Sequence, residues 1–329
     1  MTADGVDISS APPASREEAP APRSARRPAP RPRRRTRLGR ALAPLPWLAP
    51  SLLLMAGVVV YPVFEMVRTS LSDINISGLS TGGVGLRNFG WVLEQEGLGL
   101  VLRNTLVWVV LVVGLTVLAS LALAQLLDER FPGRRLVRWA LIVPWAASLV
   151  MTAAVWKWML NYYYGIVNGA LGWVGLIDEP RDWLGDSSTS FYAMVLVGVI
   201  VSIPFTTYVI LAGLQGIPRE LYEAARVDGA GAWRTYRAIV LPLLRPALLV
   251  GVVLNVIYVF NSFPIIWIMT QGGPGRDTDT TVTLVYKLAF RDHAIDEAAA
   301  LSVLNVVALL VVVGIYVAVV GRRSREVRL

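Results

Sequence analysis

The uncharged stretch Asn104–Leu127, NTLVWVVLVVGLTVLASLALAQLL, is the segment that decides the fold class. A helix needs about 20 predominantly apolar residues to cross the hydrocarbon core of a bilayer. The stretch meets that requirement without a single acidic or basic side chain. We therefore predict a membrane-spanning helix at these residues.

Five further stretches of the chain have the same character. Four of them are Ala140–Trp156, Ser187–Pro218, Pro246–Gly275 and Ala300–Gly321, and Ala41–Val60 lies inside the fifth. Only 16% of all residues are charged, against about 25% in an ordinary soluble domain. A soluble core can hold one or two such helices but not six in succession. The sequence therefore predicts an all-α polytopic membrane protein with six transmembrane helices.

The basic residues are distributed unevenly between the two sides of the membrane. If the N-terminus is cytoplasmic, the cytoplasmic side holds 23 of the 31 lysines and arginines, including Arg130, Arg134, Arg135 and Arg138 of the second loop. This is the positive-inside bias of multi-pass membrane proteins. It predicts a bacterial inner-membrane protein with both termini cytoplasmic. It also accounts for the net charge of +8 without a nucleic-acid partner.

The composition divides the chain into a tail, a membrane domain and a short basic end. Residues 1–45 are mostly Ala, Pro and Arg, a composition that cannot bury enough apolar surface to offset its ordering entropy, so we predict disorder there. The arginines of residues 31–40 can contact anionic membrane lipid. The predicted membrane domain is residues 46–321, and residues 322–329 form the basic C-terminus. The absence of cysteine and the single histidine, His293, exclude disulfides, thiolate chemistry and a histidine-based metal cluster.

The most informative loop is residues 217–242, IPRELYEAARVDGAGAWRTYRAIVLP. Pro218 suits the first turn of a helix, where its missing N–H costs nothing. Gly229 and Gly231 then break that helix, and a second helix is expected from about Ala232 until just before Pro242. The loop is therefore predicted to be two short helices joined by a glycine turn.

This loop resembles the EAA signature of binding-protein-dependent ABC importer permeases. The matching positions are Glu223, Ala224, Ala225, Gly229, Ile239, Leu241 and Pro242. The resemblance implies that the loop is the coupling helix, which sits in a cleft of an ATPase subunit. It implies further that Glu223 pairs with a basic residue there, and that Gly229 lets the chain turn between the two helices.

The resemblance also implies the composition of the whole transporter. A second homologous permease, two ATPase subunits and an extracytoplasmic solute-binding protein would join this chain. ATP and Mg would be bound by the ATPase subunits, and this chain would hold no cofactor and catalyse no reaction. In agreement, neither Lys157 nor Lys287, the only lysines, belongs to a phosphate-binding GxxxxGK[ST] motif.

A second set of residues resembles the carbohydrate branch of that family. Phe263, the run TQGGPG at residues 270–275 and Thr280 carry this resemblance. It implies that a sugar is contacted at mid-membrane by Ser202, Phe205, Asn261 and Ser262. Ser262 stands where the maltose type has asparagine, and Phe205 lacks a tyrosine's hydroxyl. An asparagine inside an apolar helix needs a hydrogen-bond partner, which a sugar or a neighbouring helix can supply.

Three functions other than sugar import are compatible with parts of the sequence. An importer of glycerol phosphate, a polyol or another small solute keeps the same machinery, although uncharged fourth and fifth helices make an anionic cargo harder to accommodate. An ion-coupled secondary transporter usually buries charged relay residues, whereas Glu65, Arg68, Arg103 and Lys157 lie towards helix ends. A membrane-embedded enzyme would need a cluster of His, Asp and Glu at membrane depth, and the sequence offers none.

Overall fold

The computed structural model describes residues 45–75 and 77–325. Its contacts divide the chain into two compact units, residues 1–55 and residues 56–329. The described part of the first unit is the helix α2 (Leu45–Met55), whose side chains from Trp47 onward are mostly exposed. The tail predicted to be disordered, residues 1–45, lies outside the described residues except for Leu45, and so do residues 326–329 of the predicted C-terminus.

The second unit is almost entirely helical. Its helices are α3 (Tyr61–Ser70), α4 (Arg87–Glu94), α5 (Leu98–Asp128), α6 (Arg134–Trp145), α7 (Leu149–Met159), α8 (Ile166–Trp173), α9 (Ser187–Gln215), α10 (Arg219–Val227), α11 (Ala232–Thr235), α12 (Leu241–Phe260), α13 (Phe263–Met269), α14 (Thr281–Phe290) and α15 (Ile295–Arg325). Two π-helical turns, Ala56–Val60 and Tyr236–Val240, precede α3 and α12. The strands β1 (Ser72–Ile74) and β2 (Ser80–Gly83) form a small antiparallel hairpin that the sequence did not predict.

Among the described residues, five helical segments are long and apolar enough to cross a membrane. They are Trp47–Ser70, Leu98–Asp128, Ser187–Gln215, Ala232–Phe260 and Ile295–Val319. Their surfaces carry many exposed Leu, Val and Ile side chains, as expected where lipid replaces water as the solvent. The predicted all-α polytopic fold is confirmed.

The predicted third span, Ala140–Trp156, consists of two helices rather than one. The helix α6 ends at Trp145, and α7 starts after Ser148, whose backbone is extended (φ −60°, ψ 136°). Pro144 stands close to the break, and a proline supplies no N–H to the helical ladder. The apolar run therefore predicted an apolar helical segment here but not the break between α6 and α7 within it.

The sequence predicted that the helix after Gly231 ends just before Pro242. This prediction is wrong, because the helix continues past Pro242. The helix α11, the π-helical turn Tyr236–Val240 and α12 run on as one segment to Phe260. In the π turn the Leu241 N–H donates to the Tyr236 carbonyl, five residues earlier. This wider turn accommodates a proline that would otherwise clash with the preceding turn of an α-helix.

The centre of the second unit is a close contact of α5, α9 and α12. A side-chain carbon added at Gly198 of α9 would lie 2.9 Å from the Trp108 ring of α5, and one added at Gly213 would lie 2.5 Å from the Cβ of Ala247. The Trp108 indole N–H donates to the Val259 carbonyl of α12 at 3.0 Å. The glycines thus let the helix backbones approach, and the indole satisfies its polar group inside the contact.

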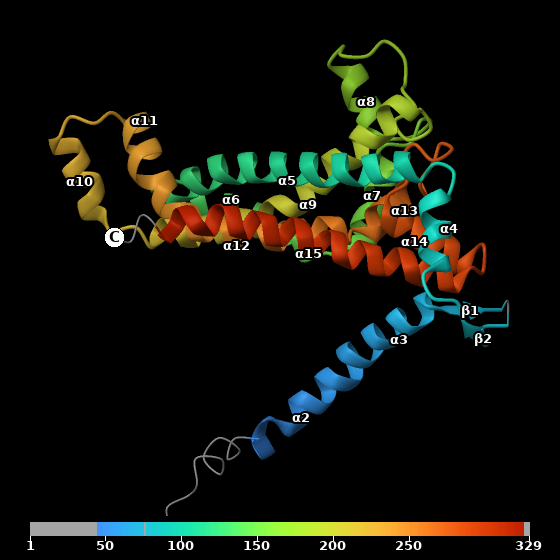
Figure 1. Ribbon diagram of the computed structural model, residues 1–329. Helices are drawn as coiled ribbons and strands as arrows, with labels where there is room; N and C mark the ends of the chain where they lie inside the picture. Colours follow the sequence, from blue (N-terminus) through green and yellow to red (C-terminus); the bar gives the residue numbers. More distant parts are fainter. Residues whose placement is uncertain (1–44, 76, 326–329) are drawn as a thin grey trace, which may run out of the picture. The chain divides into compact units, whose positions relative to one another are not determined.

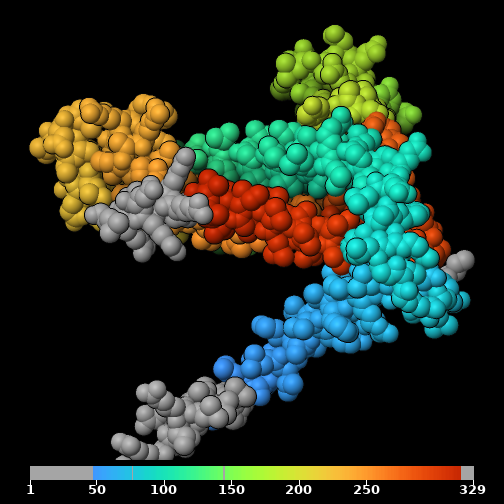
Figure 2. All heavy atoms as spheres, in the orientation of Figure 1, coloured from blue at the N-terminus to red at the C-terminus, as the bar shows by residue number. Residues whose placement is uncertain are grey.

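The two ends of the long helices carry different connections (Figure 1). The helices α10 and α11 lie at one end, and we name residues 217–242 the coupling loop. The helices α8, α13 and α14 and the β1–β2 hairpin lie at the other end. In the space-filling view the coupling loop projects beyond the ends of α5 and α15 (Figure 2).

Candidate coupling and substrate sites

The coupling loop begins with the amphipathic helix α10. Pro218 precedes its first residue with an extended backbone (φ −58°, ψ 138°), and Glu220 lies in the first turn, where the helix dipole favours an acid. Tyr222 packs beside the buried cluster formed by the ends of α5, α9 and α12, and Ala225 is buried. Glu223 and Ala224 are exposed. The helix is thus anchored on one face and presents its acid and a small residue on the other.

The end of α10 is fixed by the backbone of Gly229. This glycine has φ +73°, in the left-handed region. Its N–H donates to the Arg226 carbonyl at 3.1 Å, and the Ala230 N–H donates to the Ala225 carbonyl at 2.8 Å. These two bonds form a Schellman motif, in which glycine is preferred because it has no Cβ to oppose the positive φ. No atom lies within 4 Å of where a Cβ would stand, so the constraint at Gly229 is conformational rather than steric crowding.

The remaining predicted coupling residues lie in the segment that joins the loop to α12. Ile239 is half-buried in the π-helical turn, and Leu241 and Pro242 are half-buried in the first turn of α12. Val240 between them is 2% exposed and belongs to the same apolar cluster as Tyr222 and Tyr236. The loop is therefore connected to α12 both by packed side chains and by the helical segment that runs from α11 into α12.

Two side chains of α10, Tyr222 and Glu223, differ in their electrostatic surroundings. Burial, reinforced by the nearby Asp128 carboxylate, raises the pKa of the Tyr222 hydroxyl above its ordinary value. Glu223 forms no ion pair with any described residue. The carboxylate of Glu223 thus remains available to a partner.

Two of the predicted sugar contacts lie on α9, close to Pro204. Ser202 is buried, and its backbone carbonyl accepts the Thr206 hydroxyl at 3.1 Å. The ring of Phe205 stacks on Trp145 of α6, with centroids 6.5 Å apart and an interplanar angle of 20°. Phe205 is thus in contact with an aromatic neighbour on the side of α6.

The other two predicted contacts lie at the break between α12 and α13, not inside one helix. The Asn261 amide donates to the Ile257 carbonyl at 2.8 Å, whereas the buried Ser262 hydroxyl has no partner among the described residues. Asn261 also lines a cavity of about 170 Å³. The other lining residues are Met66, Phe260, Val282, Val285, Ser302, Asn305, Val306 and Leu309. Ser202 and Phe205 do not line this cavity, so the four predicted residues do not share it.

The TQGGPG run belongs to a polar network that we name the anchor network, comprising the side chains of residues 270–287 and their partners on α5. Within it the Lys287 ammonium pairs with the Asp279 carboxylate at 2.6 Å, and the Thr283 hydroxyl donates to the same carboxylate at 3.0 Å. Asp279 is fully buried, and the Lys287 side chain is 16% exposed. Burial raises the pKa of Asp279, although the ammonium and hydroxyl oppose that shift.

The anchor network also fixes the glycines and the start of α5. Gly272, at φ +85°, lies so close to Asp279 that no side chain fits there. The Thr278 hydroxyl donates to the Gly273 carbonyl at 2.7 Å. On α5, the Asn104 amide donates to the Asp277 carbonyl at 3.0 Å and the Thr105 hydroxyl accepts the Thr281 N–H at 2.9 Å. The run therefore ties the α13–α14 connection to α5.

Residues 104–326 match the family model of the binding-protein-dependent transport system inner membrane component. The chain belongs to this family. It is the transmembrane permease subunit of an ABC transporter, a multi-pass inner-membrane protein, and not the ATPase.

Relatives of this permease cover most of its length. A probable ABC transporter permease protein of Brucella suis is 44% identical over 84% of this chain and 96% of its own. The trehalose/maltose transport system permease protein of Thermococcus litoralis is 37% identical over 74% of this chain and 81% of its own. The sn-glycerol-3-phosphate transport system permease protein of Yersinia pseudotuberculosis is 32% identical over 89% and 99%.

The fold of this permease also has a solved counterpart. A bacterial ABC transporter involved in the import of the acidic polysaccharide alginate superposes with a TM-score of 0.75. The match covers 87% of this chain and 99% of that one, at 23% identity. It supports the ABC importer permease fold.

The Asp279–Lys287 pair is the feature of this permease that sequence reasoning missed. The two residues are eight positions apart, on a loop and on α14, so no helical or strand periodicity relates them. One signal was present: Lys287 is one of only two lysines in the chain. A lone lysine in an apolar helix needs a buried partner, and the nearby acids were candidates.

Proposed function

We propose that this permease translocates a carbohydrate delivered by an extracytoplasmic solute-binding protein. A second homologous permease would complete the pathway, and two ATPase subunits would bind ATP and Mg. The coupling loop carries the part of this proposal that concerns the ATPase subunits. Its helix α10 exposes Glu223 and packs through Tyr222 against the same apolar cluster as the start of α12. In the proposed mechanism the ATPase subunits hold α10, and their closure moves α12.

The location of the coupling loop relative to the cell follows from the charges. The loop and the C-terminal end of α15 lie at the same end of the long helices (Figure 1). Arginines are concentrated at that end, in residues 130–138 and 219–245. The positive-inside bias supports a cytoplasmic location for this end, and in our proposal both termini are cytoplasmic.

The cavity beside Asn261 supports a neutral, hydroxylated cargo. Its polar lining consists of the amides of Asn261 and Asn305 and the hydroxyl of Ser302, with no charged side chain. Such groups hydrogen-bond to sugar hydroxyls in either direction, since amides and hydroxyls both donate and accept. Its volume of about 170 Å³ is below the roughly 300–1,000 Å³ of typical ligand pockets, so the surrounding helices would have to part during transport.

Glycerol phosphate is the second candidate cargo, and one relative carries that substrate in its name. A phosphate would need arginines, lysines or helix N-termini to balance its charge. Uptake measurements decide between the two. The transporter is purified with its co-expressed partner subunits, reconstituted in proteoliposomes and supplied with labelled maltose, trehalose or sn-glycerol-3-phosphate. ATP-dependent uptake of a sugar supports the proposal, and uptake of the phosphate alone overturns it.

One variant pair tests the cavity itself. Asn261→Ala should weaken sugar affinity by about two- to tenfold, because one hydrogen bond to a neutral partner contributes about 0.5–1.5 kcal/mol. Val282→Ala enlarges the same cavity without removing a polar group. If both variants transport with the wild-type KM, the sugar passes elsewhere.

A further inference from the structure

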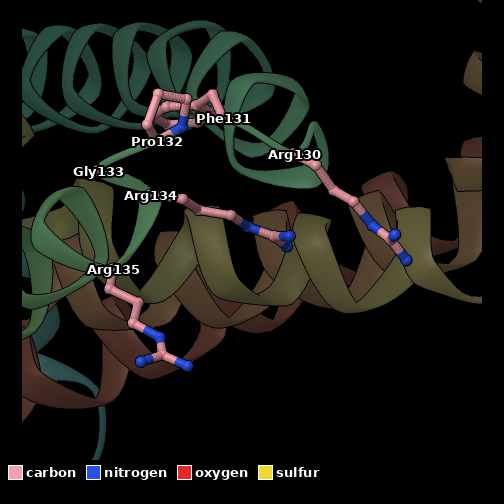
Figure 3. Close-up of a pocket in the computed structure, with 6 residues that line it drawn as sticks. All are labelled: Arg130, Phe131, Pro132, Gly133, Arg134 and Arg135. Carbon is pink, nitrogen blue, oxygen red and sulfur yellow. The ribbon is translucent and has the colours of Figure 1, made fainter.

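A basic hollow lies where α5 ends and α6 begins. It has a volume of about 570 Å³ and is lined by Arg130, Phe131, Pro132, Gly133, Arg134 and Arg135. The side chains of Arg130 and Arg134 extend towards the same side of the hollow, and Arg135 points away from them (Figure 3). Gly133, at φ +89°, reverses the chain between the two helices. The connection thus brings Arg130, which follows the end of α5, close in sequence to Arg134 and Arg135 at the start of α6.

The arginines of this hollow are not neutralised by the described part of the chain. None of Arg130, Arg134, Arg135 and Arg138 forms an ion pair with a described residue. The enclosed Nε atoms of Arg134 and Arg138 have no hydrogen-bond acceptor there either. Two acids, Asp128 and Glu129, adjoin the segment, and Asp128 lies near Tyr222 of α10. The segment therefore retains a net positive charge and unused donors.

The hollow continues into an exposed apolar face of α6. Val137 and Leu141 pack inward against the cluster at the end of α9. Leu136, Trp139 and Val143, three to four residues apart, lie on another face and are 74%, 64% and 62% exposed. Because α5 is long enough to span the bilayer, its end at Asp128 lies at the level of the lipid headgroups, and α6 returns from there towards the hydrocarbon.

We propose that the hollow binds the headgroup of an anionic phospholipid, whose acyl chains lie along Leu136, Trp139 and Val143. Arginine matches the geometry of a phosphate because its planar guanidinium donates two parallel hydrogen bonds. A protein partner would satisfy the arginines equally well. The apolar face beside them favours a lipid, which joins an anionic group to a long apolar chain.

The experiment measures lipid bound to the whole transporter, purified with its partner subunits in mild detergent. Native mass spectrometry follows the binding of added dioleoylphosphatidylglycerol, with dioleoylphosphatidylcholine as the zwitterionic comparison. The variant is R130Q/R134Q, which removes the two arginines that extend to the same side of the hollow. The control is R103Q/R181Q, which removes two exposed arginines from the opposite end of the molecule. Each basic residue near a membrane surface contributes about 1 kcal/mol, so the variant should bind phosphatidylglycerol about 30-fold more weakly.

Each outcome supports or overturns the proposal. Loss of phosphatidylglycerol binding in R130Q/R134Q alone, with unchanged gel-filtration behaviour, supports it. Equal binding in the variant and the control overturns it. Complete displacement of the lipid by millimolar inorganic phosphate would show a site for small anions instead. Loss of the ATPase subunits with lipid binding intact would show a protein-docking surface.

Discussion

The coupling loop and the anchor network hold opposite ends of the same helices by different kinds of contact. The anchor network consists of a buried ion pair and several side-chain hydrogen bonds between the α13–α14 connection and α5. The coupling loop is held mainly by apolar packing of Tyr222, Tyr236 and Val240. One end is thus fixed by directional polar contacts and the other by non-directional apolar ones.

This difference teaches where the molecule can move. A hydrogen bond weakens steeply when its angle changes, so a network of them favours one geometry. Apolar contact depends on the area removed from water and tolerates a small tilt or slide. We therefore expect the anchor network to act as the fixed end and the coupling loop as the end that responds to a partner.

The largest expected effect comes from breaking the fixed end. Asp279→Ala leaves the mostly buried Lys287 ammonium without its partner. This loss should destabilise the protein by about 3–5 kcal/mol. Thermal unfolding of the purified protein measures this loss. Asp292→Ala removes an exposed acid at the same end and should have little effect. If the two variants unfold at the same temperature, the buried ion pair does not stabilise the anchor network as we expect.

The second effect tests the responsive end. Glu223→Ala should weaken association with the ATPase subunits by about 2–5 kcal/mol, as expected when one member of an interfacial charge pair is removed. Stability should change little, since Glu223 is exposed. Co-purification of the ATPase subunits measures the association. Glu220→Ala on the same helix is the matched control, and an equal loss in both variants would mean that Glu223 has no special role.

The third effect concerns the turn within the coupling loop. Gly229→Val forces a β-branched residue into φ +73°, a strain of about 1–3 kcal/mol that should misorient α10. Gly231→Val is the control, because Gly231 has φ −68° and open space around it. The ratio of sugar transported to ATP hydrolysed should fall only in Gly229→Val. An equal ratio in both variants would show that the left-handed turn is dispensable.

The smallest effect concerns an exposed polar contact near the fixed end. Hydrogen bonds from Thr81 and Arg87 lower the pKa of Asp73, which is partly exposed on the β1–β2 hairpin. A lowered pKa means that the contact stabilises the hairpin above the ordinary pKa of about 3.8 and is lost as the pH falls through the folded-state value. The protection of the hairpin amides from hydrogen exchange, taken relative to the intrinsic exchange rate at each pH, should fall as the pH drops below about 3.8. Asp73→Asn should remove that dependence, and an unchanged profile would contradict it.

The sequence predicted the features that depend on local composition. Apolar runs identified the membrane segments, because a bilayer imposes a minimum length. Gly229 identified the turn in the coupling loop, because few residues other than glycine adopt a positive φ readily. In both cases the cause lies within a few residues of its effect.

The features that were not predicted are helix breaks that hydropathy does not mark and contacts between distant residues. The breaks before Ser148 and at Asn261 interrupt apolar runs that look continuous, and hydropathy contains no information on them. The roles of Ser202, Phe205, Asn261 and Ser262 also depend on how the helices meet, and Phe205 meets Trp145 of α6. The candidate substrate contacts therefore remain a prediction.

The π-helical turn Tyr236–Val240 has a mechanical consequence. A π turn holds one residue more than the α-helical turn it replaces, so it shifts the register of the helix by one residue. Moving it along a helix by several positions would rotate the intervening side chains by about 100°, the angle of one residue, without unfolding them. Pro242 comes directly after Leu241 and has no N–H to donate to the helix. We therefore expect the π turn to stay at this position. A similar π turn, Ala56–Val60, precedes Pro62 at the start of α3. In both helical segments a π turn is thus followed by a proline, which fixes the position of the extra residue in the helix.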